Sequence, residues 1–76
     1  MSAPKKRSVT IRGHRTSISL EDAFLHELER LAEERGVPVA ALIAELDATR
    51  PRAVNLSSAI RLHVLAALKR EAGRGE

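Results

Sequence analysis

Apolar and polar residues alternate along residues 15–20, and this pattern predicts a β-strand. One face of the strand would turn toward a core and the other toward solvent: Thr16, Ile18 and Leu20 on the first, Arg15, Ser17 and Ser19 on the second. Residues 9–12 alternate in the opposite phase. The change of phase near Gly13 indicates a bulge or a bend, and it leaves the course of residues 8–14 open.

Three amphipathic segments follow the strand. Residues 21–35 are expected to form a helix with one apolar stripe, which begins at a Ser19-to-Asp22 capping pattern and ends at Gly36. Residues 38–48 predict a second helix, with Pro38 in its first turn. Asn55 is a suitable N-cap for a third helix over residues 56–70, whose apolar residues spread over more than one face, so one side is expected to meet another subunit.

The chain length makes a partner subunit attractive. A core built from 76 residues rarely supplies more than about 3–5 kcal/mol, and the sequence has no cysteine for a disulfide. A lone strand also leaves its backbone groups unpaired. We therefore predict an intertwined homodimer with an intermolecular two-stranded ribbon. Its core would contain these residues: Thr16, Ile18, Leu20, Phe24, Leu28, Leu42, Ile43 and Leu46.

Charge is distributed unevenly along the chain. Residues 1–20 carry five basic residues and no acidic one, whereas residues 21–36 carry six acidic residues against two basic ones. This arrangement favours one surface for a polyanion and another for water. Residues 1–7 are interpreted as a basic, disordered arm, residues 8–70 as the domain, and residues 71–76 as a frayed tail.

Catalysis and metal binding find little support. The three histidines lack partners at metal-ligand spacing, and no phosphate loop or nucleophile motif is present. Neither an enzyme, a cofactor nor a metal site is expected. There is no secretory signal pattern and no long apolar run, so we expect a cytoplasmic protein without a membrane segment.

The strand carries the functional hypothesis. A ribbon of two antiparallel strands fits the DNA major groove, where Arg15 can bond a guanine and Ser17 and Ser19 can bond several base edges. An ordinary half-solvated edge strand would show the same polar face, and the strand alone favours that simpler interpretation. If this segment instead folds back onto its own chain, or lies loose in solution, the case for binding in the DNA groove is lost with it.

The order of the elements changes this balance. The strings RTSISL, LAEERG and VPVAALI resemble the ribbon-helix-helix proteins, the Arc/MetJ-type repressors. GHRTSISLEDAF with NLSSAIRLHVL is similar to a bacterial subgroup that has a third C-terminal helix. The implied fold is mainly α with one short β-strand.

The resemblance also implies how DNA would be bound. The paired strand would enter the major groove, and backbone N–H groups at the second helix start, at Val39 and Ala40, would approach a phosphate. This helix start lacks the Ser or Thr common in the family. Further phosphate contacts are expected from the basic residues Lys5, Lys6, Arg7 and Arg12.

We therefore expect a homodimeric, double-stranded DNA-binding transcriptional regulator, with a repressor as the family example and the nucleoid as its location. Recognition would depend on sequence or on DNA shape. The alternative is an antitoxin-like or adaptor module that binds a protein partner through the apolar third helix.

Overall fold

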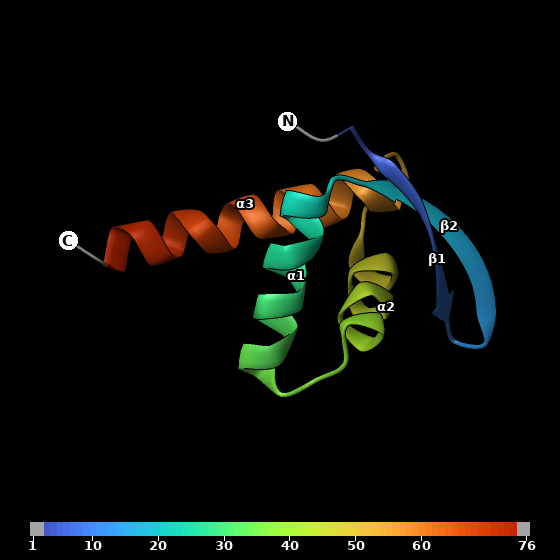
Figure 1. Ribbon diagram of the computed structural model, residues 1–76, viewed down its shortest axis with the longest axis horizontal. Coiled ribbons are helices and arrows are strands. Elements are labelled where there is room, and N and C mark those ends of the chain that lie inside the picture. The colour runs from blue at the N-terminus through green and yellow to red at the C-terminus, as the bar shows by residue number, and fades with distance from the viewer. Residues whose placement is uncertain (1–2, 75–76) are drawn as a thin grey trace.

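The computed structural model describes residues 3–74, which form a two-stranded hairpin followed by three helices (Figure 1). The elements are β1 (Lys5–Ile11), β2 (His14–Leu20), α1 (Asp22–Arg35), α2 (Val39–Thr49) and α3 (Leu56–Arg74). Helix α3 crosses the tops of α1 and α2. The hairpin lies at one end of the molecule and the C-terminal end of α3 at the other (Figure 1).

A two-residue turn joins the strands. Arg12 and Gly13 both have positive φ, 50° and 81°, as a type I′ hairpin turn requires. The turn places Ile11 opposite His14, and the antiparallel register continues to Lys5 opposite Leu20. Cross-strand partners share a face, so a two-residue turn reverses the odd–even phase of the chain. The phase change near Gly13 is therefore a hairpin turn, and the predicted bulge or bend is corrected.

The pairing partner of β2 differs from the prediction. We expected a second copy of the chain, but β2 pairs with β1 of the same molecule. The expectation of a single strand is wrong, because residues 5–11 form β1. The expectation of a disordered arm is wrong for residues 5–7, which belong to β1; residues 1 and 2 lie outside the described residues. The inference of a dimer from an unpaired strand therefore loses its premise, and the case for groove binding that depended on a ribbon shared by two subunits is lost with it.

Helix α1 begins later than the capping pattern indicated. Its N-cap is Glu21, without a side-chain hydrogen bond, because Ser19 is still part of β2. Asp22 in the first turn suits the positive end of the helix dipole. Gly36 ends the helix as predicted, in the left-handed conformation at φ 69°. Pro38 is the N-cap of α2 and lies one residue before the helix.

Helix α3 begins as predicted and ends later. The Asn55 Oδ1 atom accepts a hydrogen bond of 2.8 Å from the Ser58 N–H, which confirms the N-cap. The helix continues to Arg74, so residues 71–74 of the predicted tail are helical; residues 75–76 lie outside the described residues. An ion pair of 3.0 Å between Arg30 of α1 and Glu71 contributes to holding this extra turn.

The core closes within one chain. Six large side chains are almost completely buried, and they come from β2 and all three helices: Leu20, Leu28, Leu42, Ile43, Ile60 and Val64. Burial of each contributes roughly 1.5–3 kcal/mol relative to exposure. Within residues 3–74, no helix is both long and apolar enough to cross a membrane.

The residues predicted for a dimer core divide into three groups. Five are buried in the core of this single chain: Ile18, Leu20, Leu28, Leu42 and Ile43. Phe24 and Leu46 are half-buried and pack against that core. Thr16 is exposed, contrary to the prediction, because it lies beside an open hollow between β2 and the helices.

Candidate nucleic-acid interface

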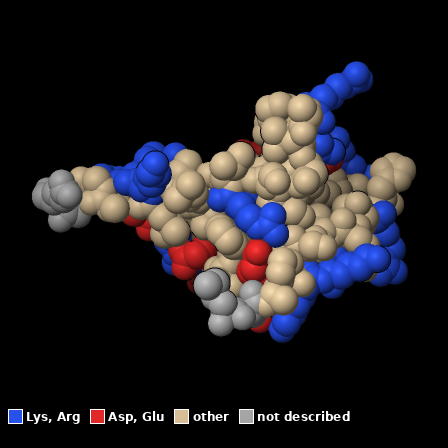
Figure 2. Space-filling model, turned by 90° about the horizontal axis from the view of Figure 1, so that it is seen from above, with Lys and Arg blue, Asp and Glu red and all other residues tan. Residues whose placement is uncertain are grey.

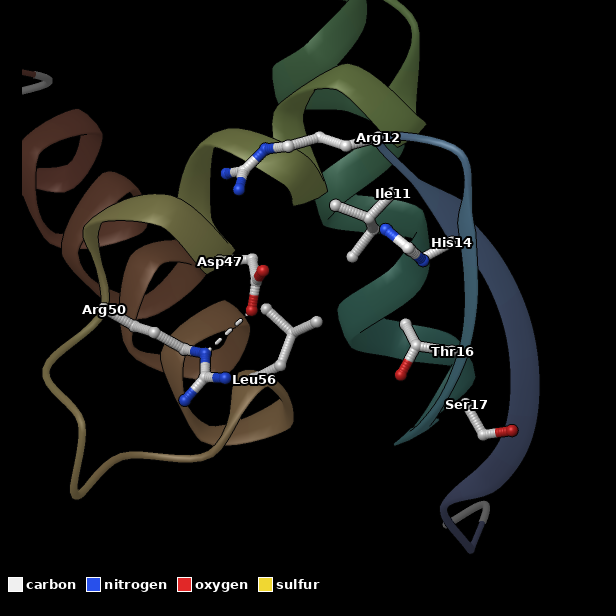
Figure 3. A pocket seen from close by; sticks show the side chains of 8 residues that line it. All are labelled: Ile11, Arg12, His14, Thr16, Ser17, Asp47, Arg50 and Leu56. Carbon is white, nitrogen blue, oxygen red and sulfur yellow. Dashed lines mark hydrogen bonds and ion pairs between the residues drawn. The ribbon is translucent and has the colours of Figure 1, made fainter.

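The hairpin presents one face of polar side chains to solvent, which we call the outward face. It consists of alternate residues from both strands, all of them exposed: Lys6, Ser8, Thr10, Arg15, Ser17 and Ser19. The register places Lys6 opposite Ser19, Ser8 opposite Ser17, and Thr10 opposite Arg15. Figure 3 shows the alternation directly, because the Ser17 side chain points away from the helices while Thr16 points toward them.

The outward face contains two cations, four hydroxyl groups and no carboxylate. Each of these side chains can donate a hydrogen bond, and the hydroxyls can also accept one. Within residues 3–74, no side-chain hydrogen bond or ion pair is seen for any of them. The polar atoms are therefore available to an external ligand that is rich in acceptors.

The dimensions of the hairpin suit a DNA groove. Strands in a sheet lie about 4.8 Å apart, and seven residues extend about 23 Å at roughly 3.3 Å per residue. The major groove is about 12 Å wide and admits a two-stranded ribbon. The outward face of this single-chain hairpin is therefore of a size to reach base edges.

Helix α3 fixes the position of the hairpin at Ser19. The Ser57 hydroxyl accepts a hydrogen bond of 3.2 Å from the Ser19 N–H, and Arg61 donates one of 3.2 Å to the Ser19 carbonyl. Arg61 also pairs with Glu21 at 2.9 Å, and it lies 5.9 Å from the centre of the Phe24 ring. The arginine thus connects α3 to the junction between β2 and α1.

The structure brings together the three predicted base-contacting residues, Arg15, Ser17 and Ser19, on the outward face. It separates the predicted phosphate-contacting residues. Lys6 lies on the outward face, whereas Lys5 and Arg7 turn inward and pair with Asp22 of α1.

The other predicted phosphate contacts lie away from this face. Arg12 occupies the hairpin turn, where its guanidinium donates a hydrogen bond of 3.2 Å to the Ala44 carbonyl. Val39 and Ala40 begin α2, whose N-cap makes no side-chain hydrogen bond. Contacts of these residues with phosphate stay predictions.

Sequence reasoning did not assign Ser8 and Thr10 to the site. They alternate with Val9 and Ile11, and Gly13 after them suits the second position of a two-residue hairpin turn. Treating residues 5–11 as the second strand would have placed both residues opposite Arg15 and Ser17.

A shallow hollow of about 320 Å³ lies behind the hairpin (Figure 3). Its wall includes Ile11 and Leu56, together with Arg50, which pairs with Asp47 at 2.9 Å. Within the described residues, no group of three potential metal-ligating side chains is found.

Basic side chains gather at the hairpin end of the molecule. Figure 2 shows Lys and Arg atoms over this end and also toward the C-terminal end of α3, while Asp and Glu atoms lie nearer the middle. The outward face itself carries Lys6 and Arg15. The outward face therefore offers a polyanion positive charge without a carboxylate beside it.

The structure is that of a small helical protein with a polar, basic β-ribbon. The family model of the ribbon-helix-helix domain matches residues 4–68, and the chain belongs to this family. The match includes both strands, α1, α2 and most of α3. Ribbon-helix-helix domains generally bind DNA as dimers and regulate transcription. No curated protein and no solved structure matches the chain.

Proposed function

We propose that this protein binds double-stranded DNA by placing the outward face of its hairpin in the major groove. The observation that carries the proposal is the composition of that face: six exposed hydrogen-bonding side chains, two of them cationic and none acidic. In an ordinary solvent-exposed strand, acidic side chains would be as suitable as basic ones, so the lack of carboxylates on this face favours an anionic ligand.

The side chains have distinct roles in this proposal. Arg15 makes a bidentate contact to a guanine, and the hydroxyls of Ser17 and Ser19 bond to nearby base edges. Lys6 lies opposite Ser19 and contacts a phosphate at the groove wall. Because serine side chains are short, part of the sequence preference comes from DNA shape.

A homodimer forms through the second edge of β2. The Ser19 N–H points away from β1, toward Ser57, so the N–H groups of Ser17 and Arg15 point the same way. Within residues 3–74, no hydrogen bond is seen for these two N–H groups. The edge is therefore open for β2 of a second copy, with Ser17 at the two-fold axis.

Transcriptional regulation follows from site-specific binding by such a dimer. We place the protein in the cytoplasm with the nucleoid, and we propose a repressor that acts by occupying its site. No catalytic step is part of this function.

A titration of a fluorescent duplex at low salt tests the proposal. The wild-type protein should bind, and Ser8→Glu should abolish binding because it puts a carboxylate at the centre of the outward face. Ala72→Glu is the matched control, since it adds the same charge at an exposed position near the opposite end of the molecule. Wild-type protein that ignores duplex DNA, or equal binding by both variants, would contradict the proposal.

Helix α3 supports a second candidate function, protein binding. Leu62, Leu65 and Leu68 form an exposed apolar stripe, with 58%, 50% and 40% of their surfaces accessible. Lys69 lies one turn after Leu65, and the single acid of α3, Glu71, is paired with Arg30. The stripe therefore suits a partner protein with an acidic amphipathic helix.

Affinity capture from the native host separates the two functions. Under the second proposal, a stoichiometric partner with such a helix co-purifies with wild-type protein, and Leu65→Glu loses it while Ala72→Glu retains it. If the Leu65→Glu variant behaves like wild type in capture, protein binding through α3 is excluded.

A further inference from the structure

Asp22, in the first turn of α1, pairs with two basic side chains of β1. Its carboxylate pairs with the Lys5 ammonium at 3.1 Å and with the Arg7 guanidinium. Arg7 also donates a hydrogen bond of 3.2 Å from Nε to the Leu20 carbonyl. One acid at the start of α1 thus engages two of the three consecutive cations that begin β1.

The strand pleat makes this arrangement possible. Lys5 and Arg7 share the inward parity of β1 with Val9 and Ile11, so both side chains extend toward α1. Lys6, between them, points outward. The hydrogen bonds from Arg7 and Lys5 lower the pKa of Asp22, so its carboxylate stays ionised at neutral pH and both pairs persist.

We propose that Asp22 acts as an internal substitute for a DNA phosphate: it holds Lys5 and Arg7 away from DNA and so weakens sequence-independent binding. This inference rests on the proposed DNA binding and adds a residue that limits it. The Arg7 guanidinium is less exposed, and it also bonds the Leu20 carbonyl without Asp22. Exposed ion pairs, such as that of Lys5 with Asp22, contribute little to stability. Their effect on binding is larger because each cation withheld removes one phosphate contact.

The salt dependence of binding measures such contacts. For duplex DNA, the logarithm of the binding constant falls with the logarithm of salt concentration by about 0.9 per neutralised phosphate. Release of Lys5 and Arg7 by Asp22→Asn should therefore steepen the slope by about one to two. Affinity for a random-sequence duplex at low salt should rise about tenfold or more.

Three variants, titrated with a random-sequence duplex over a range of salt concentrations, test this inference. Asp22→Asn should show the steeper slope. Glu29→Gln, at an exposed position on the same helix, makes the same change in net charge and should keep a slope close to that of wild type. Adding Lys5→Gln and Arg7→Gln to Asp22→Asn should remove the gain.

The outcomes separate this inference from the proposed function. If wild type binds DNA and Asp22→Asn has the same slope, Asp22 does not compete and the inference is wrong. A gain that survives in the triple variant, or that appears equally in Glu29→Gln, also overturns it. If wild type fails to bind, the proposed function is lost. If the Asp22→Asn variant then binds DNA although wild type does not, competition by Asp22 is supported. If neither protein binds DNA, both the proposed function and this inference are wrong.

Discussion

Ser8 and Ser17 lie directly opposite each other at the middle of the hairpin, and both side chains are exposed on the outward face. This pair shows that one chain supplies both strands of the polar ribbon. The face is therefore present before any subunit association. The proposed DNA binding through this face and the proposed dimer formation through the edge of β2 can therefore be tested with different variants.

Arg15 is expected to carry the strongest base contact. Arg15→Ala should weaken binding to a selected duplex by about 1–3 kcal/mol, or roughly 5- to 150-fold, because it removes a bidentate pair. Arg74→Ala is the matched control, as it removes the same charge from the far end of α3. Fluorescence anisotropy at fixed salt provides the measurement, and equal losses in the two variants would show that Arg15 acts through net charge alone.

Gly13 is expected to stabilise the hairpin through its conformation. Its φ of 81° is unfavourable for alanine, although an added Cβ would meet nothing within 4 Å. Gly13→Ala should therefore cost about 1–2 kcal/mol. Such a loss lowers the melting temperature by about 4–8 °C per kcal/mol in a domain of this size.

At Gly73, in α3, a change from glycine to alanine should have the opposite effect on stability. This residue is helical and also has nothing within 4 Å of an added Cβ, so Gly73→Ala should stabilise the protein by about 0.5–1 kcal/mol. Thermal melts of the two variants by circular dichroism should move in opposite directions. Equal melting temperatures would contradict the assigned turn conformation at Gly13.

The dimer is expected to depend on the open edge of β2. Ser17→Pro removes an N–H that points away from β1, so the hairpin should form while pairing with a second copy fails. Ser8→Pro makes the same change on the outer edge of β1 and should leave the dimer intact. Light scattering should give the monomer mass of 8.3 kDa for the first variant and twice that mass for the second. Dimeric Ser17→Pro protein would place the interface elsewhere.

His63 is expected to make the fold sensitive to mild acid. Burial lowers its pKa below the ordinary value of 6.5, and the nearby charges of Arg70 and Arg35 act in the same direction. The neutral imidazole is favoured in the folded state. Its contribution to stability is therefore present above about pH 6.5 and is lost as the pH falls through the lowered pKa.

Melting temperatures at pH 7.5 and pH 5.5 test this effect. The difference between the two values should be smaller in His63→Gln than in wild type. The carboxylates of Glu21, Asp22 and Glu71 do not interfere, because their pKa values are lowered and they titrate below this window. If the difference in melting temperature between the two pH values is the same in His63→Gln as in wild type, His63 does not cause the sensitivity to acid.

Local patterns were sufficient to predict much of the fold. The helical stripes, the Gly36 terminus and the Asn55 cap depend on residues a few positions apart, and the structure confirms them. The pairing of β2 depends on residues 5–11, whose many charges resemble a solvated arm. Lys5 and Arg7 face inward there and pair with Asp22, and sequence spacing does not reveal that contact.

The sequence predicted the part of the outward face that lies on β2, but not the part that lies on β1. Alternation within β2 identified Arg15, Ser17 and Ser19, because a strand has a period of two whatever its partner. The β1 contribution required the register, which the Arg12-Gly13 turn sets. The contacts of Ser57 and Arg61 with Ser19 join residues about 40 positions apart, and no local pattern indicates them.

Backbone amide chemical shifts recorded by NMR during titration with a duplex test most directly whether DNA binds at the hairpin. Binding through the outward face should produce the largest changes in β1 and β2, at the outward-face residues, while the C-terminal half of α3 stays unchanged. Changes confined to α3, with the hairpin signals unmoved at saturating DNA, would contradict it.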